Sequence, residues 1–182
     1  MISVERLSEG VRLEGVNYGL PMVMLKLGPV GQDYNTPEQL IRDVLDKTRC
    51  KWVCIFGQET TRIGMGNLAK GFAAIGMQTE IECDASIVNP GWMHTVSRWM
   101  VDYAENPSWN LGALREHDMV RFTIQSVAEV KIAQEGFNNL KMFPGNRIVK
   151  LVGDKATLRD LQPLVFDLVR KTERARLYIQ QV

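Results

Sequence analysis

The sequence predicts a single small α/β domain, folded either as a partial (β/α)6-type barrel or as an open, mostly parallel sheet. Two observations support this fold class. Short apolar runs alternate with segments whose apolar residues recur at helical spacing, and strands that are apolar on both faces are typical of parallel sheets covered by helices. The 182 residues allow one sizeable core but fall short of the ~250 residues of a complete eight-fold barrel.

The apolar runs predict six strands, over residues 22–27, 51–56, 78–82, 118–124, 147–152 and 176–180. The run 92–97 is compatible with a further strand. Parallel strands need crossover connections, so helices are expected between most of them.

Four segments carry helix signals. Thr36-Pro37-Glu38 supplies an N-cap, a proline at the first helical position and an acid in the first turn. Gly76 fits the C-terminal cap of a second helix. Ser126 is expected to cap a third helix, through residue 134, and Thr157 a fourth. The apolar residues expected to face the core include Leu40, Ile41, Val44 and Leu45 in the first helix, Met65, Leu68, Phe72 and Ile75 in the second, and Leu158, Leu161, Val165 and Leu168 in the last.

The composition is that of an ordinary globular protein, with 45% hydrophobic and 24% charged residues. The formal net charge of +1 gives no electrostatic reason to expect a nucleic-acid or membrane surface. No apolar run approaches the ~20 residues needed to span a bilayer, and the N-terminus lacks the apolar stretch of a signal peptide. Three cysteines, an odd number, fit a reducing compartment, so we expect a cytoplasmic protein.

Cys50 and Cys54 have a C-x3-C spacing that could suggest a metal site. They bracket the start of the apolar run 51–56, and no third thiol follows nearby. We therefore interpret them as buried thiols of a core strand.

Polar residues gather after several predicted strands. In α/β folds ligands bind at the carboxyl ends of the strands, so these segments form the predicted ligand pocket. They are residues 57–61 (GQETT), residues 82–86 (ECDAS) and the pair Ser97-Arg98, with Arg121 within the 118–124 strand.

In their order along the chain these segments resemble the 7-carboxy-7-deazaguanine synthase (QueE) family, radical S-adenosylmethionine enzymes of the 7-deazaguanine pathway. Residues 12–15 (RLEG) stand where that family has Q-G-E-G, and residues 57–61 where it has G-G-E-P-T. Residues 82–86 are similar to its E-T-N-G-T, Ser97-Arg98 to its S-P-K loop, and residues 118–122 (DMVRF) to its D-E-x-K-F. The resemblance covers most of the chain, and it implies a radical-enzyme fold with a pocket at the strand ends. The residues it assigns to this pocket are Glu14, Lys26, Gly57, Gln58, Glu59, Glu82, Asp84, Ser97, Arg98 and Arg121.

The departures from the family are as informative as the matches. The family places three cluster cysteines after its first strand, whereas residues 28–34 (GPVGQDY) contain none. Gln58 and Thr60 replace the glycine and proline of the cofactor loop, and Arg12 and Lys26 stand where glutamine and arginine are expected. We therefore expect neither a 4Fe–4S cluster nor bound S-adenosylmethionine.

These features lead to two hypotheses about function. The first is a pseudoenzyme that binds a protein partner (another protein or its own copy) or a purine-like or pteridine-like molecule. The second is an enzyme of another class, in which Glu59, Glu82 and Asp84 serve as acid/base groups or metal ligands. A homodimer is expected, formed through the edge strand 176–180 or through an aromatic middle region containing Trp92, Met93, Trp99, Met100 and Trp109.

Overall fold

The computed structural model describes residues 1–15, 17–58, 60 and 63–182. Within them the strands are β1 (Ile2–Val11), β2 (Pro21–Leu27), β3 (Gln32–Tyr34), β4 (Trp52–Gly57), β5 (Gln78–Asp84), β6 (Arg98–Asp102), β7 (Met119–Ile124), β8 (Asn146–Gly153) and β9 (Ala175–Gln181). The helices are α1 (Pro37–Lys47), α2 (Ile63–Ala74), α3 (Val127–Asn139) and α4 (Lys155–Arg170), and two short 3-10 turns are η1 (Met93–Thr95) and η2 (Leu111–Ala113). None of these helices has the length and apolar character needed to cross a membrane.

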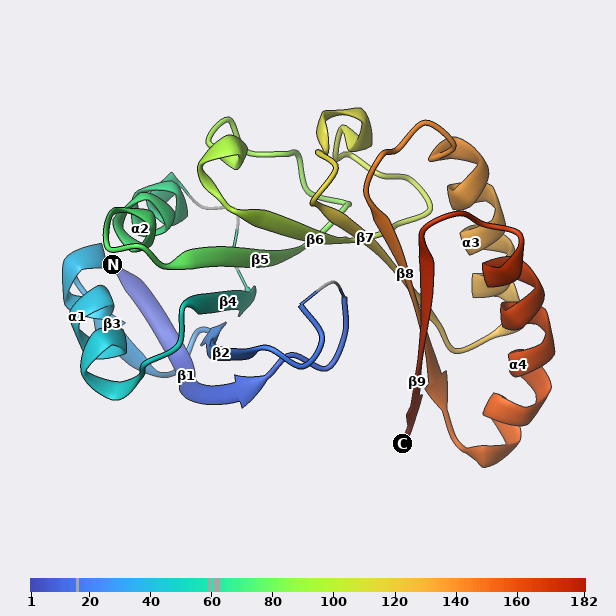
Figure 1. The fold of residues 1–182 in the computed structure, drawn as a ribbon, viewed down its shortest axis with the longest axis horizontal. Coiled ribbons are helices and arrows are strands. Elements are labelled where there is room, and N and C mark those ends of the chain that lie inside the picture. The colour runs from blue at the N-terminus through green and yellow to red at the C-terminus, as the bar shows by residue number, and fades with distance from the viewer. Residues whose placement is uncertain (16, 59, 61–62) are drawn as a thin grey trace. The chain divides into compact units, whose positions relative to one another are not determined.

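The strands form one open sheet in the order β3-β1-β2-β4-β5-β6-β7-β8-β9 (Figure 1). β1 pairs with β2 and β3 antiparallel, whereas β2–β4, β4–β5, β7–β8 and β8–β9 are parallel pairs. The predicted α/β fold is thus confirmed as an open, mostly parallel sheet. By its contacts the chain divides into two compact units. The first unit comprises Met1–Leu13, Asn17–Cys83 and Ile87–Met100, and the second comprises residues 14 and 15, Asp84–Ser86 and Val101–Val182.

The first unit packs α1 and α2 against each other beside its strands. α1 begins as predicted, because the Thr36 side chain accepts a hydrogen bond from the Gln39 N–H while the Gln39 side chain accepts one from the Thr36 N–H. α2 ends at a left-handed Gly76, and the N–H of Met77 bonds back to the Phe72 carbonyl. The interior residues include Leu25, Leu40, Ile55, Leu68 and Phe72, none of which exposes measurable surface.

The second unit packs α3 against β7 and α4 against β8 and β9. Phe122 of β7 lies between two rings, stacked on Tyr103 and edge-on to Phe137 of α3, with ring centroids 4.7 Å away in both pairs. Such aromatic contacts add to area burial in fixing a helix on a sheet.

Several sequence expectations are wrong. The run 92–97 is no strand: Thr95 Oγ1 donates to the Trp92 carbonyl and closes η1, so β6 begins only at Arg98. Asp154, and not Thr157, caps α4, because its side chain accepts from the Thr157 N–H at 2.8 Å. Leu45 and Ile75 are each 43% exposed, because Leu45 lies outside the buried face of α1 and Ile75 follows the end of α2. Cys50, expected to be a buried strand thiol, is half-buried and precedes β4.

The aromatic middle region also differs from the expectation of an exposed interface. Trp99 and Met100 are fully buried, and Met93 and Trp109 are nearly so. Trp92 is half-buried against Trp99, with ring centroids 5.5 Å apart. The four buried side chains are core residues and cannot anchor a partner while the chain keeps this fold.

Candidate functional site

A buried cluster of charged side chains occupies one face of β4 and β5 in the first unit. Arg12, which follows β1, places its Nε 2.9 Å from Glu80 Oε1 and its Nη1 2.6 Å from Glu82 Oε1. A third contact runs from Arg12 Nη2 to Met100 Sδ at 3.1 Å. Arg12 is 5% exposed and Glu80 is fully buried, so one interior guanidinium contacts two carboxylates.

Further polar side chains extend this cluster, which we call the Arg12 cluster. Asn17 donates to Glu80 Oε2 at 2.8 Å and accepts from Arg98 Nη1. The Arg98 guanidinium lies over the Trp52 ring, 5.0 Å from its centroid. Glu80 is therefore contacted from both sides, by Arg12 and by Asn17, as a buried carboxylate must be if it is to stay charged.

Burial dominates the ionisation of this cluster. It raises the pKa of Glu80, an effect that the positive charge of Arg12 opposes and the neighbouring Glu82 charge reinforces. Burial, and then the Glu82 charge, hold the pKa of the Cys54 thiol well above its ordinary value. Cys54 is thus an inert thiol that donates to Glu82 Oε1 at 3.5 Å.

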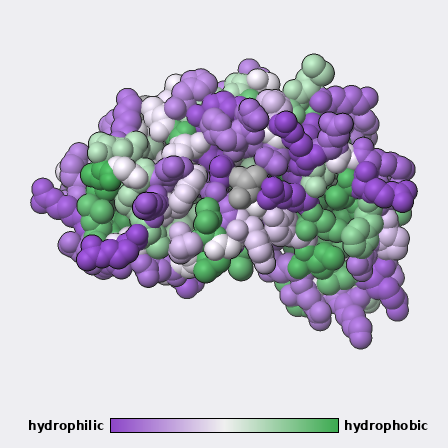
Figure 2. All heavy atoms as spheres, in the orientation of Figure 1, coloured by the Kyte–Doolittle hydropathy of each residue, from purple (hydrophilic) through white to green (hydrophobic). Residues whose placement is uncertain are grey.

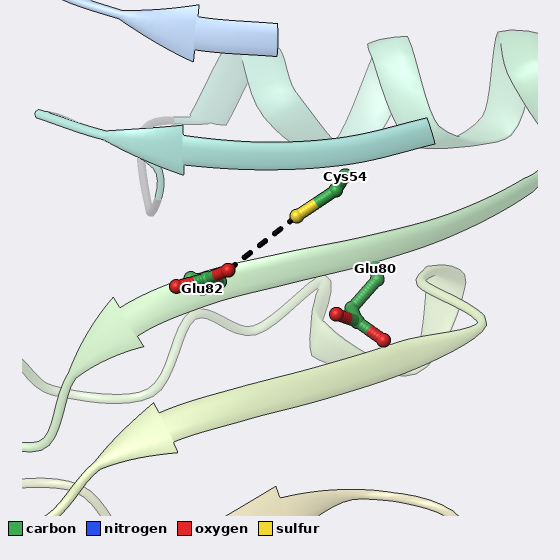
Figure 3. Close-up of side chains that lie close together, drawn as sticks. All are labelled: Cys54, Glu80 and Glu82. Atoms are coloured by element: carbon green, nitrogen blue, oxygen red, sulfur yellow. Dashed lines mark hydrogen bonds between the residues drawn. The ribbon is translucent and has the colours of Figure 1, made fainter. Parts of the chain in front are cut away.

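Cys54, Glu80 and Glu82 form the one group of potential metal ligands found among the described residues, with donor atoms within 4.8 Å of one another. Figure 3 shows the Cys54 sulfur pointing from β4 toward the Glu82 carboxylate on the neighbouring strand. The guanidinium of Arg12 already contacts both carboxylates. A divalent cation at this point would have to displace Arg12 and deprotonate Cys54.

The second unit contains another charged group, built around Arg121 of β7. Arg121 Nη1 contacts Glu14 Oε1 at 2.5 Å, and its Nη2 and Nε donate to the two oxygens of Asp102, the former at 2.8 Å. Lys150 of β8 lies 3.7 Å from the same Glu14 oxygen. Glu14 is 8% exposed, and its other oxygen, Oε2, is buried without a hydrogen-bond partner.

The other predicted pocket residues have local partners. Lys26 forms an exposed ion pair with Glu5, Asp84 accepts from the Ser86 N–H in its own turn, and Ser97 exchanges hydrogen bonds with Thr79. Gly57 has φ of 103°, and a Cβ there would lie 2.3 Å from the Leu27 carbonyl oxygen, so only glycine fits. Gln58 is exposed, and its N–H bonds to the Leu27 carbonyl. Glu59 lies outside the described residues.

The structure therefore groups some predicted residues and not others. Glu82 and Arg98 belong to the Arg12 cluster, and Glu14 and Arg121 pair with each other. Sequence reasoning missed several members of these groups, among them Asn17, Glu80, Asp102 and Lys150. One signal could have found Glu80. Glu80 and Glu82 alternate along the predicted strand 78–82, and in a parallel sheet covered by helices both faces of a strand are buried, so a charge there needs a partner.

The three cysteines do not converge. Cys54 shares a face with Glu80, its partner in the β4–β5 register, whereas Cys83 lies three positions along β5 and so projects to the opposite face. Cys50 precedes β4, with its sulfur 3.8 Å from Glu9 Oε1. Cys50, Cys54 and Cys83 therefore lie on different faces or segments of the first unit.

No protein-family model matches the sequence, and no curated protein matches it. Among solved structures, that of QueE from Escherichia coli is similar, with a TM-score of 0.72 over 98% of this chain and 93% of that chain. The two sequences are 14% identical, so the likeness concerns the fold. This chain has a QueE-like fold.

Proposed function

We propose that the protein is a relative of QueE that acts by binding and does not cleave S-adenosylmethionine. The single observation that carries the absence of S-adenosylmethionine cleavage is the placement of the thiols. Residues 28–34 contain no cysteine, and Cys54 and Cys83 project from opposite faces of neighbouring strands. Reductive cleavage of S-adenosylmethionine needs a cluster to deliver the electron, and these thiols cannot hold one.

The Arg12 cluster supports the same proposal. In α/β folds of this kind ligands bind near the strand ends, and here the side chains of β4 and β5 on one face contact one another through Arg12. Arg12, Glu80 and Cys54 are all at least nine-tenths buried. Arg12 and Glu80 compensate each other's charge and the Cys54 thiol is neutral, which is the arrangement of a filled interior.

The ligand that this fold would bind is a planar, purine-like or pteridine-like molecule that donates N–H groups. Arg121 supports this choice, because it lines a cavity of about 380 Å³ together with the carboxylates Asp102, Glu105 and Glu129 and the ring of Tyr103. This volume is within the size range of small-molecule sites. Glu14 is not part of the lining; it acts on the site through Arg121, whose Nη1 contacts Glu14 Oε1. A carboxylate next to an aromatic ring can accept from the ring nitrogens of such a ligand while the ring packs against it.

The first experiment tests the absence of radical chemistry. The purified protein is reconstituted anaerobically with iron and sulfide, then incubated with S-adenosylmethionine and a strong reductant. We expect no stoichiometric cluster absorbance and no 5′-deoxyadenosine above a no-protein control. A stoichiometric cluster, or 5′-deoxyadenosine formed in proportion to protein, would contradict the proposal.

The second experiment tests ligand binding: pterin is titrated with the protein, and the pterin fluorescence is followed. Glu14→Gln keeps the shape of the side chain but removes its charge, so we expect about tenfold weaker binding. Glu116→Gln, an exposed acid of the same unit, is the matched control and should bind like the unaltered chain. If the unaltered protein binds neither pterin nor guanosine, or if Glu14→Gln binds equally well, the ligand part of the proposal is wrong.

A further inference from the structure

A second cavity, of about 490 Å³, lies in the second unit at the opposite ends of the strands, where β8 and β9 begin. Its wall is formed by the end of α3, by residues that follow α3 and α4, and by the start of β8. Four cationic side chains line it, Lys141, Arg147, Lys171 and Arg174, against a single carboxylate, Glu173. We call it the Arg147 pocket. It is independent of the proposed function.

Arg147 is the buried centre of this pocket. The residue is 5% exposed, and its guanidinium reaches only carbonyl oxygens: Nη1 donates to Glu173 at 3.3 Å, and Nη2 to Leu140 and Phe143. Its Nε is buried without any hydrogen-bond partner. Burial, and then the charge of Arg174, lower the pKa of Arg147. A bound anion would therefore compensate the buried positive charge of Arg147.

The positive charge of the pocket is not balanced by carboxylate partners of its cations. Among the described residues, neither Arg147, Arg174 nor Lys141 forms an ion pair with a carboxylate; Arg174 donates to the Pro144 carbonyl. Lys171 contacts Asp167, which lies outside the pocket lining, at 2.6 Å.

Capping explains part of the arrangement, because cations favour helix C-termini and both α3 and α4 end here. Each helix end carries only about half a negative charge, so four cations exceed what the two ends and Glu173 require.

The backbone at Arg174 is a further outlier. Arg174 has φ of 55°, the only positive φ of a non-glycine residue in the described part of the chain. An arginine in the left-handed region is strained, and such strain concentrates at functional sites. Here it belongs to the turn that joins α4 to β9 and that brings Arg174 into the pocket wall.

We propose that the Arg147 pocket binds the phosphate group of a small organic phosphate. The Nε of Arg147, which has no hydrogen-bond partner, and the cationic side chains of Lys141 and Arg174 in the same lining suit a tetrahedral oxyanion with several acceptor oxygens. Apolar side chains complete the lining, including Phe143, whose ring lies 5.6 Å from the Arg147 guanidinium. The phosphate neutralises Arg147, and the organic part packs against this apolar wall.

Calorimetric titration in buffer of low ionic strength tests the proposal, with phenyl phosphate and inorganic phosphate as probes. We expect both to bind, phenyl phosphate more tightly, and phenol not to bind. Arg174→Gly removes one cation but suits the left-handed backbone, so it should weaken phenyl phosphate binding about tenfold while the chain stays folded. Lys141→Ala should also weaken binding.

Arg159→Ala is the matched control, since it removes an exposed cation of α4 whose partner is the exposed Asp160. It should leave the affinity for phenyl phosphate unchanged. The proposal is overturned if neither phosphate probe binds at millimolar concentration, if phenol binds as well as phenyl phosphate, or if Arg174→Gly and Lys141→Ala have no larger effect than Arg159→Ala.

Discussion

Arg12 and Glu80 face each other in the interior of the first unit, with Arg12 Nε 2.9 Å from Glu80 Oε1 and both side chains at least 95% buried. This ion pair joins the segment after β1 to the middle of β5, and its two residues lie 68 positions apart in the sequence. A buried pair of this kind is weak support for stability compared with apolar packing, but the loss of either partner leaves a charge without compensation. The pair therefore constrains both segments.

The first prediction concerns Arg12→Met. The change leaves Glu80 and Glu82 buried without their cation, so the free energy of unfolding should fall by about 3–5 kcal/mol, as measured by urea denaturation. Arg159→Met, which breaks only an exposed ion pair, should change it by less than about 0.5 kcal/mol. Adding Glu80→Gln to Arg12→Met should recover part of the loss. Equal stabilities of the two single variants would show that the buried pair does not hold the fold.

The second prediction uses the pH dependence of the same group. Because the pKa of Glu80 is raised above its ordinary value of about 4.5, the folded chain binds more protons than the unfolded chain at a pH between the unfolded and the folded pKa. Its contribution to stability is fully present below the unfolded pKa and is lost as the pH rises through the folded pKa. The free energy of unfolding of the unaltered protein, minus that of Glu80→Gln, should therefore fall as the pH rises above about 4.5. A difference that stays constant, or rises, would contradict the raised pKa.

Most of the fold could be predicted from local signals. The Thr36 cap and the Gly76 stop define α1 and the end of α2, and six apolar runs correspond to β2, β4, β5, β7, β8 and β9. β1 was missed because its burial is irregular and its sequence carries polar residues throughout, as suits a strand with one partly exposed face. The run 92–97 has strand-forming residue types, yet its Trp92 and Thr95 close a turn, which propensity alone does not reveal.

The site was harder to predict for a physical reason. Pairs such as Arg12 with Glu80 or Glu14 with Arg121 join residues far apart in sequence, and only the sheet order brings them together. Motif order drew attention to Glu82, Arg98, Glu14 and Arg121, which do have charged partners. It could not tell which positions would be satisfied locally, as Asp84 is by the Ser86 N–H.

The third prediction concerns Tyr34 and Asp43, which join β3 to α1 through a hydrogen bond from the phenol to the carboxylate. Burial, and then this bond, raise the pKa of Tyr34 to about 12. In a spectrophotometric titration, the phenolate signal of Tyr34 is the part of the signal of the unaltered protein that Tyr34→Phe lacks. This signal should therefore appear near pH 12. Asp43→Asn should move it to lower pH, because the neutral amide no longer disfavours the phenolate. A Tyr34 signal at about pH 10 in the folded, unaltered chain would contradict the contact.

The last prediction is self-association through β9. This strand is the edge of the sheet, and an edge strand offers unpaired backbone groups to a second copy of the chain. Ile179 is 48% exposed and Val182 is 74% exposed, and hydrophobic side chains gather over β9 and α4 on the face drawn in Figure 2. After Arg176, β9 carries no further charge that would discourage pairing. Because Trp99 and Trp109 of the middle region are buried, this edge is the stronger candidate interface.

Light scattering should therefore give about twice the 20.6 kDa mass of the chain, and Ile179→Lys should reduce it to the mass of one chain. The lysine places a charge on the strand that pairing would have to desolvate, and lysine is a residue that natural edge strands use against association. Val30→Lys alters a more exposed apolar residue, in a loop of the first unit, and should leave the dimer intact. A single-chain mass for the unaltered protein over a wide concentration range would refute the dimer. A dimer that survives Ile179→Lys would refute β9 as its interface, because a two-fold pairing of edge strands would bring two such lysines into the same contact.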